Sequence, residues 1–254
     1  MKTDTSYIEK NKDYLEMKVK DIVTENFWTA SLFESSGIDY CCNGNQVLKE
    51  ALEKNKISRD KFTVELNKVN QSTESQMPRY NDWDLIFLTQ YIINNHHSYV
   101  KSAIPRITEL LRKVQAAHGS KYSYIAGIQS AFSQVADEMT AHMMKEERIL
   151  FPLIKYLAES KMFNEKPRTK GFGTIKNPIR QMEAEHISAG GAVETIRTLT
   201  GNYTLPKDAC TTFKVTYKEL DEFEKDLHKH VHLENNILFP RAIEMEEVLL
   251  SENK

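Results

Sequence analysis

Apolar residues gather in four long helical segments in the second part of the chain, near residues 82–116, 121–160, 176–200 and 207–250. Polar loops that contain glycine or proline separate them: AAHGSK, a basic loop through KPRTKGFGTIKNP, and TGNYTLPK. No segment shows the alternating, β-branched pattern of a strand. The pattern therefore predicts an all-α fold that contains a four-helix bundle.

The first part of the chain predicts a smaller helical domain. Short helices from about Leu15 to Val69 surround the turn SSGIDYCCNG, and the polar stretch QSTESQMPR that follows is typical of a linker. We expect an N-terminal extension over 1–14 with no assigned role, a helical domain over 15–70, a linker over 71–80 and the bundle over 81–250. Asn81 or Asp82 is expected to cap the first bundle helix, which begins WDLIFLTQYIINNHH.

Composition narrows the functions that are open to this protein. Only 9 glycines and 7 prolines interrupt 254 residues, which favours helix, and a formal net charge of −2 gives no large basic field for nucleic acid or anionic lipid. No apolar run is long enough to span a bilayer, and the start MKTDTSYIEKNKDYLEMKV lacks the apolar stretch of a secretory signal. We expect a cytoplasmic protein without a nucleic-acid or membrane partner.

The three cysteines do not make a disulfide framework. Cys41 and Cys42 are adjacent, and a bond between them would close a strained ring, so we expect reduced thiols. They precede a helix start predicted near Gln46, and a helix N-terminus lowers the pKa of a thiol. Redox chemistry, iron transfer or nitric oxide handling is one interpretation of the pair; packing of two small apolar side chains is the other. Cys210 is expected in the core.

An internal repeat carries the chemistry. The segment HMMKEERILFP begins at His142 and HVHLENNILFP begins at His230, so each copy has a glutamate four residues after its histidine, at Glu146 and Glu234. This spacing places histidine and glutamate on one helical face. Two such pairs on facing helices can build a two-metal site in a bundle core. The ILFP tail is expected to supply apolar packing, and its proline to bend or end the helix beyond the site.

Further ligands are expected from the other two helices: His96 or His97 in the first, and His186 in the third. Four histidines and two carboxylates suit iron, manganese or zinc, and the number and type of ligands favour iron. The alternative is a helical bundle whose histidines are hydrogen-bonded and hold no metal. In that interpretation Glu183 or Glu185 is the partner of His186.

Three more histidines are expected outside the ligand set. His228 and His232 lie two residues either side of His230, so they point away from its helical face and are predicted to be solvated. His118 stands beside Gly119 at a helix end, where a helix cap or a group that supports a ligand is expected.

The repeat and the DYCCNG turn together resemble the bacterial repair-of-iron-centres family (RIC; ScdA/YtfE). The stretches that carry the resemblance are GIDYCCNG, AHMMKEERILFP, MEAEH, DACTTFK and HLENNILFPRA, and it covers nearly everything from about Leu15 to Met245. It implies an ScdA-type N-terminal domain followed by a hemerythrin-like bundle. One departure is Asn43-Gly44, where the family has a double glycine; asparagine tolerates left-handed backbone angles, so we expect the turn to persist.

The resemblance also implies a non-haem di-iron centre, carboxylate-bridged and oxo-bridged, with the ligands His97, His142, Glu146, His186, His230 and Glu234. It selects His97 over His96 because His97 stands eight residues before Pro105. His118 matches a family histidine and, with Glu185, is expected to support the ligands.

The activity that the resemblance implies is repair of iron–sulfur clusters damaged by oxidative or nitrosative stress, by donation of iron to the damaged proteins. Two alternatives are retained: a di-iron nitric oxide reductase, which would be an enzyme, and a hemerythrin-like protein that binds or senses oxygen or nitric oxide. The polar linker would also permit the small domain to be exchanged between chains of a homodimer.

Overall fold

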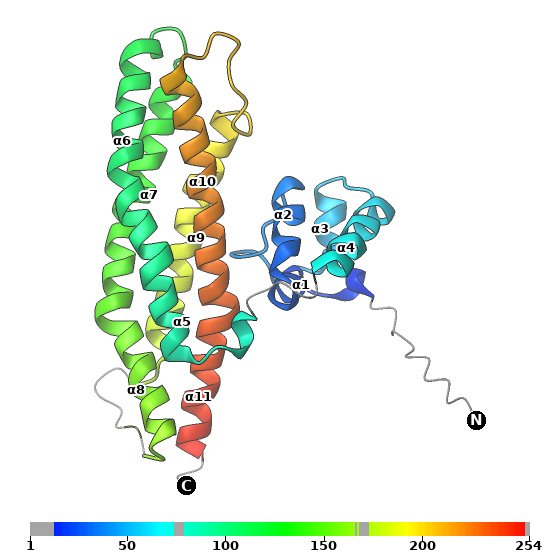
Figure 1. Ribbon diagram of the computed structural model, residues 1–254, viewed down its shortest axis with the longest axis vertical. Helices are drawn as coiled ribbons and strands as arrows, with labels where there is room; N and C mark the ends of the chain where they lie inside the picture. The colour runs from blue at the N-terminus through cyan, green and yellow to red at the C-terminus, as the bar shows by residue number, and fades with distance from the viewer. Residues whose placement is uncertain (1–12, 74–78, 166, 168–172, 252–254) are drawn as a thin grey trace, which may run out of the picture. The chain divides into compact units, whose positions relative to one another are not determined.

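The computed structural model describes residues 13–73, 79–165, 167 and 173–251. In these ranges the regular structure is helical, and an isolated antiparallel bridge between Lys18 and Val47 is the one contact of β type. The chain divides into two compact units, Met1–Pro78 and Arg79–Lys254 (Figure 1). The predicted all-α fold is confirmed.

The first unit packs short helices around a small apolar core. Phe33 and Phe62 meet edge to face with their ring centres 5.2 Å apart, and Leu48 is fully buried. Of the predicted linker, residues 71–73 form the end of the last helix and 74–78 lie outside the described residues, as do residues 1–12. The elements are η1 (Tyr14–Glu16), α1 (Val19–Glu25), η2 (Phe27–Thr29), α2 (Ala30–Ser35), α3 (Leu48–Lys54) and α4 (Arg59–Thr73).

The second unit is a four-helix bundle, and Figure 1 shows its helices side by side along the long axis. Each helical segment predicted there corresponds to one bundle helix. The first comprises α5 (Leu85–Ile92), η4 (Ile93–His97) and α6 (Ser98–His118); the second comprises α7 (Tyr124–Lys145), η5 (Glu146–Leu150) and α8 (Phe151–Met162); the third is α9 (Lys176–Leu199); the fourth comprises α10 (Thr211–Leu233), η6 (Glu234–Leu238) and α11 (Phe239–Ser251).

Three of the bundle helices contain a five-residue π segment, namely η4, η5 and η6. Segments of this kind are rare and often occur at functional sites. Pro152 and Pro240 are the second residues of α8 and α11, which follow η5 and η6, so neither proline ends its helix. A proline near the start of a helix lacks only a donor that the first turn does not need. The repeat therefore marks a local change of helix type within a continuous helix.

The first bundle helix begins slightly later than predicted. Residues Tyr80–Asp82 form the 3-10 turn η3, so neither Asn81 nor Asp82 is the cap. Asp84 is the N-cap of α5, and its Oδ1 accepts a hydrogen bond from the backbone N–H of Phe87 at 2.8 Å. The acidic side chain that satisfies the free amides is the one directly before the apolar run.

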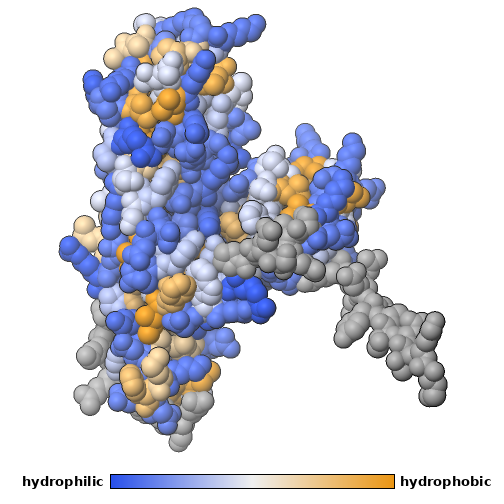
Figure 2. All heavy atoms as spheres, viewed as in Figure 1, coloured by the Kyte–Doolittle hydropathy of each residue, from blue (hydrophilic) through white to orange (hydrophobic). Residues whose placement is uncertain are grey.

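Apolar side chains fill the interior of the bundle. Phe132 and Phe223, for example, pack edge to face with their ring centres 5.3 Å apart. Figure 2 shows the surface of the face in view, where hydrophilic residues predominate and hydrophobic ones form small patches. Within the described ranges, every helix is too short or too polar to cross a membrane.

Candidate metal centre

The six residues predicted as ligands meet inside the bundle. Each of their side chains is at most 1% exposed, so the group is shielded from bulk water. The π segments contribute to this placement, because three of the six stand at the end of η4 or the start of η5 and η6. The residues come from all four bundle helices: His97 from η4, His142 from α7, Glu146 from η5, His186 from α9, His230 from α10 and Glu234 from η6.

The six side chains form two overlapping groups that could each hold a metal ion, with ligand atoms within 4.8 Å of one another. One group pairs His97 with His230, and we call it the His97–His230 position. The other pairs His142 with His186, and we call it the His142–His186 position. Both groups include Glu146 and Glu234.

In the His97–His230 position, the two imidazoles turn their Nε2 atoms toward each other, 3.2 Å apart. Nε2 of His230 lies 2.9 Å from Oε1 of Glu234, and Nε2 of His97 lies 3.3 Å from Oε2 of Glu146. Two nitrogen and two oxygen atoms therefore point at a common small volume.

The His142–His186 position repeats this arrangement. The Nε2 atoms of the two histidines are 2.9 Å apart. Nε2 of His142 lies 3.3 Å from Oε2 of Glu146, and Nε2 of His186 lies 3.1 Å from Oε2 of Glu234.

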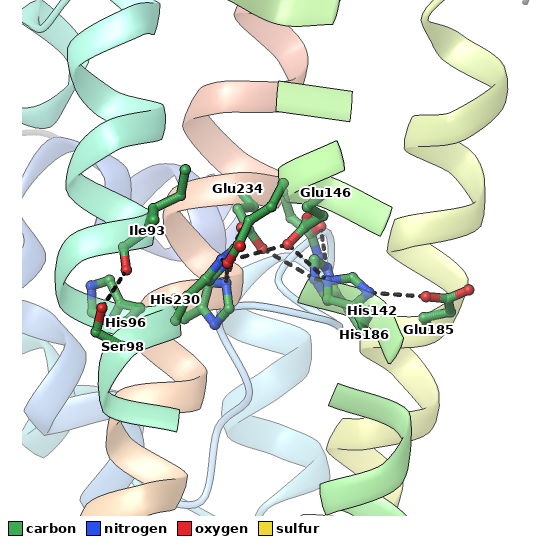
Figure 3. Close-up of polar contacts among 12 residues, drawn as sticks. Ile93, His96, Ser98, His142, Glu146, Glu185, His186, His230 and Glu234 are labelled. Atoms are coloured by element: carbon green, nitrogen blue, oxygen red, sulfur yellow. Dashed lines mark hydrogen bonds and ion pairs between the residues drawn. The ribbon is translucent and has the colours of Figure 1, made fainter. Parts of the chain in front are cut away.

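The two carboxylates lie between the positions, as Figure 3 shows. Glu234 directs Oε1 toward His230 and Oε2 toward His186, which belong to different positions. Oε2 of Glu146 is equally distant from one histidine of each position. Carboxylates that are shared in this way can bridge two cations.

The outward-facing nitrogens of three histidines of the cluster have hydrogen-bond acceptors. Nδ1 of His142 lies 3.0 Å from Oε2 of Glu185. Oε1 of Glu185 accepts a hydrogen bond from Nζ of Lys145 at 2.5 Å. Nδ1 of His97 lies 2.8 Å from Glu147, and Nδ1 of His186 lies 2.8 Å from Oδ1 of Asn235. A proton held on Nδ1 leaves the Nε2 lone pair available for a metal and fixes the ring orientation.

Two of these supporting groups, Glu147 and Asn235, escape prediction from the sequence. Both directly follow a glutamate of the repeat, so a polar residue after each repeat glutamate is the signal that could have found them. Each reaches a histidine on a neighbouring bundle helix rather than one on its own helix. Glu185 is placed beside His142, not beside the adjacent His186, and Glu183 is exposed.

The ILFP tails also support the site. Phe151 of the first copy stacks on the ring of His97 with centres 5.6 Å apart. Phe239 of the second copy lies nearly parallel to the ring of His186, at 6.2 Å and an interplanar angle of 3°. Each phenylalanine covers one face of an imidazole and helps to exclude water, so the apolar packing expected of these tails is present.

The hydrogen-bonding state of the carboxylates fits bound cations. Histidine Nε2 atoms face Oε2 of Glu146 and Oε2 of Glu234 at 3.1–3.3 Å, but within the described residues none of these contacts is a hydrogen bond, and buried Oε1 of Glu146 has no hydrogen bond either. A buried acceptor without a donor costs about 1–3 kcal/mol. Neutral imidazole and carboxylate are ligands that iron accepts, and cations among them would satisfy these oxygens. The residues present therefore fit a pair of metal ions.

The charges of the cluster agree with this fit. Burial lowers the pKa of His97 and of His142, but Glu146 and Glu234 outweigh it and raise these pKa values to about 10 and about 9. Burial acts to raise the pKa of Glu234, but His230 and His186 hold it well below its usual value. The cluster thus draws positive charge toward two buried carboxylates, and metal cations would supply that charge.

The structure separates the neighbouring histidines His96 and His97. His96 is buried, but its Nδ1 lies 2.9 Å from Oδ1 of Asp226, outside both metal positions. Its ring stacks on that of His230, with centres 5.7 Å apart and an angle of 13°. His97 is the one whose Nε2 enters the cluster.

The remaining histidines require corrections. His118 is the last residue of α6, at the end away from His97, and its Nε2 lies 3.2 Å from Sγ of Cys210, so it supports no ligand. Cys210 is exposed and is not a core residue. His232 is buried rather than solvated, with its Nδ1 2.9 Å from Nδ2 of Asn236, and burial lowers its pKa to about 3. His228 is largely buried beside Glu224, with 18% of its side chain exposed.

The cysteine turn of the first unit also differs from expectation. The helix that follows it begins at Leu48, two residues after the start predicted near Gln46. Oδ1 of Asp39 accepts hydrogen bonds from the backbone N–H groups of Cys41 and Cys42, each at 2.9 Å. The neighbouring thiol of Cys42, burial and the Asp39 carboxylate raise the pKa of Cys41 well above the ordinary thiol value. The two sulfurs are 3.7 Å apart and form no disulfide.

Asn43 is accommodated in this turn by a side-chain hydrogen bond and not, as expected, by a left-handed backbone. Its backbone is not in the left-handed region; its side-chain Nδ2 donates to Oδ2 of Asp39 at 2.7 Å. Gly44 is the residue with a steric requirement, because a Cβ there would lie 2.3 Å from the carbonyl oxygen of Tyr40. The Asp39, Cys41 and Cys42 side chains form a third group that could hold a metal ion.

Comparison with known protein families agrees with these two units. The model of the hemerythrin HHE cation binding domain matches residues 89–242, a range that contains all six candidate ligands. The ScdA_N model, described as a domain of unknown function, matches residues 15–70.

Two relatives match most of this chain and share a name. The iron-sulfur cluster repair protein YtfE of Yersinia pseudotuberculosis serotype IB (strain PB1/+) is 35% identical over 216 residues, which is 84% of this chain and 90% of the relative. The protein of the same name from Yersinia pestis (strain Pestoides F) is 34% identical over the same shares. This chain carries a hemerythrin HHE domain and belongs to the family of the iron–sulfur cluster repair protein YtfE.

Proposed function

We propose that this protein holds two iron ions in the bundle and donates iron to iron–sulfur proteins whose clusters have been damaged by oxidative or nitrosative stress. The observation that carries the proposal is the pair of carboxylates, Glu146 and Glu234, shared between two histidine pairs in a buried site. The names of its relatives, iron-sulfur cluster repair proteins, supply the biological context.

The roles of the side chains follow from their contacts. The four Nε2 atoms and the two carboxylates would hold the metal, which when bound supplies redox and Lewis-acid chemistry. Glu147, Glu185 and Asn235 fix the orientation of three imidazoles through Nδ1. A carboxylate that spans two positions can stay bound to one while the other empties, which suits a centre that releases iron.

The first unit would then contribute a second iron-binding group. Asp39, Cys41 and Cys42 place a carboxylate oxygen and two sulfurs close together, with Sγ of Cys41 3.2 Å from Oδ1 of Asp39. Thiolate and carboxylate are iron ligands, and iron would displace the thiol protons on binding. We propose this group as a transient station for iron on its way to an acceptor protein.

The first test is metal content and the visible spectrum of the purified protein after anaerobic reconstitution with iron. We expect about two irons per chain in the wild type. The Glu146→Ala/Glu234→Ala variant should lose them, because it lacks both shared carboxylates. A wild-type protein that takes up no iron would contradict the proposal at its base.

The second test follows iron into a client protein. Protein loaded with an isotopically labelled iron is mixed with an iron–sulfur enzyme whose cluster has been destroyed by nitric oxide, and the label in the rebuilt cluster is measured. We expect more recovery than from the same amount of free iron. Recovery equal to that of free iron would reject donation.

The same preparation separates the alternatives. Sustained conversion of nitric oxide to nitrous oxide with an electron donor would identify a reductase. Reversible oxygen or nitric oxide binding without cluster recovery would identify a carrier or sensor.

The cysteine station has its own test. The Cys41→Ser/Cys42→Ser variant should keep the bundle iron and lose cluster recovery, whereas Cys210→Ser is a matched control that keeps both. Full recovery by the double variant would remove the station from the proposal.

A further inference from the structure

A histidine–cysteine pair, His118 and Cys210, lies at the end of the bundle away from the candidate metal centre. His118 ends α6 and Cys210 is the N-cap of α10, and Nε2 of His118 lies 3.2 Å from Sγ of Cys210. Figure 1 shows the start of α10 at the same end of the bundle as the loop between α6 and α7. Because α6 has 21 residues, this end is about 30 Å from His97. The pair is therefore separate from the iron ligands.

The surroundings favour the thiolate of Cys210. Cys210 is the N-cap of the 23-residue helix α10, and the backbone N–H of Phe213, followed by the His118 imidazole, lowers the pKa of the thiol. The ring of Phe213 packs edge-on against that of His118, with centres 5.4 Å apart, and so helps to orient the base. A nucleophile, a base and a group that orients the base are thus present together.

The nearby charged groups do not disfavour the thiolate form of Cys210. Asp208, two residues before Cys210, would repel a thiolate, but Lys121 and the hydroxyl of Tyr122 both bind its carboxylate. Lys121 adds a positive charge at the same end. Cys210 itself is exposed, so small molecules in solution can reach its sulfur.

We propose that Cys210 and His118 form a redox-modification site that reacts with small hydroperoxides. His118 takes the thiol proton, and the sulfur attacks one peroxide oxygen. The S–O bond forms as the O–O bond breaks, and the departing oxygen takes the proton from His118. The balance is one thiol and one hydroperoxide giving one sulfenic acid and one alcohol, or water from hydrogen peroxide; sulfur is oxidised by two electrons and the peroxide is reduced.

The modification is reversible by an external small thiol. A first thiol condenses with the sulfenic acid, releases water and leaves a mixed disulfide. A second thiol attacks that disulfide, releases Cys210 in its reduced form and yields the disulfide of the small thiol. The proposal depends on no property of the metal centre.

The experiment uses the full chain, stripped of metal by a chelator so that iron does not react with peroxide. Hydrogen peroxide is added in the presence of a sulfenic-acid-trapping diketone, and labelling of each cysteine is followed by mass spectrometry across pH. Cys41, which is buried and has a raised pKa, is an internal reference. We expect Cys210 to label at least about tenfold faster than Cys41 near neutral pH.

The decisive variant is His118→Asn. It should slow labelling of Cys210 by roughly threefold to tenfold near neutral pH and shift the pH midpoint of the rate upward, since thiolate fraction and proton donation both fall. His228→Asn makes the same exchange elsewhere in the bundle, next to Glu224, and should leave the rate unchanged. An unchanged rate and midpoint in His118→Asn, or no labelling of Cys210 by peroxide in the wild type, would overturn the proposal.

Discussion

The two candidate metal positions are built from similar parts but differ in the groups that support their histidines. Each takes one histidine from a copy of the repeat, and each repeat copy also supplies a phenylalanine that stacks on a histidine of another helix. The residue before that other histidine differs. Glu185 precedes His186 and holds Nδ1 of His142, whereas His96 precedes His97 and stacks on His230.

Support on Nδ1 makes the positions chemically unequal. In the His142–His186 position both histidines have an Nδ1 partner, Glu185 and Asn235. In the other position His97 has Glu147, but Nδ1 of His230 has no hydrogen-bond partner in the part of the chain that the structure describes, and burial lowers its pKa. A hydrogen-bond partner on Nδ1 increases the basicity of a metal-binding imidazole and fixes its orientation. We therefore expect the His142–His186 position to bind iron more tightly, and iron to leave the His97–His230 position first.

The largest effect is expected from the residues that the two positions share. Glu234→Gln removes a charge that faces both His230 and His186, so iron content should fall from about two per chain to below one. Elemental analysis after reconstitution measures this. Glu224→Gln is a suitable control, because Glu224 is a buried carboxylate on α10 that binds Arg197 and Tyr203 instead. Iron loss in the control as well would indicate general destabilisation.

The next largest effect is the pH dependence of the metal-free protein. The pKa values of His97 and His142 are raised above the unfolded value of about 6.5, to about 10 and about 9. Their contribution to stability is complete below the unfolded pKa and is lost as pH rises through the folded pKa values. We expect the unfolding free energy, measured with urea, to fall by a few kcal/mol between pH 6.5 and 10.

Variants of the two repeat histidines sharpen this test. His142→Asn should remove the part of the pH dependence that lies between about 6.5 and about 9, whereas His230→Asn should leave most of the slope, because the pKa of His230 is not raised. Equal changes in the two variants would contradict the difference between the positions.

A smaller effect is expected from the supporting carboxylate alone. Glu185→Gln should weaken iron binding at the His142–His186 position by about 10–100-fold, the usual cost of losing such a partner, and leave the other position unchanged. Competition with a coloured chelator gives the two affinities. Glu183→Gln, an exposed neighbour on the same helix, is the matched control. Equal weakening of both positions would mean that Glu185 does not distinguish them.

Much of the fold and of the candidate ligand cluster could be predicted from local spacing, while the choice of His97 over His96 came from the family resemblance. Helix period locates the four bundle helices, and a histidine four residues before a glutamate places both on one face. The supporting groups could not be predicted this way, since Glu147 and Asn235 act on neighbouring helices, and the pairing of helices is a tertiary property. The π segments, which adjust the register at the ligands, likewise leave no clear signal beyond the prolines after η5 and η6.

The environments of the cysteines also could not be predicted from the sequence. Cys41 precedes a helix in the sequence, but the neighbouring Cys42 thiol, burial and Asp39 raise its pKa. Cys210 has the helix N-terminus that was expected at Cys41, together with a histidine partner 92 residues away in the chain. Sequence position alone therefore does not identify which thiol lies at a helix N-terminus beside a histidine.

The smallest effect is expected at His96, the counterpart of Glu185 in the other position. His96→Asn keeps a side-chain donor near Asp226 but removes the ring that stacks on His230. Stability should fall by about 1–2 kcal/mol in urea unfolding, while iron content stays at about two per chain. His97→Asn, one residue further, removes a nitrogen that faces the cluster and should lose iron. If His96→Asn lost iron to the same extent, the stacked histidine would be as important to the His97–His230 position as a ligand, and the two positions would be supported equally well by different means.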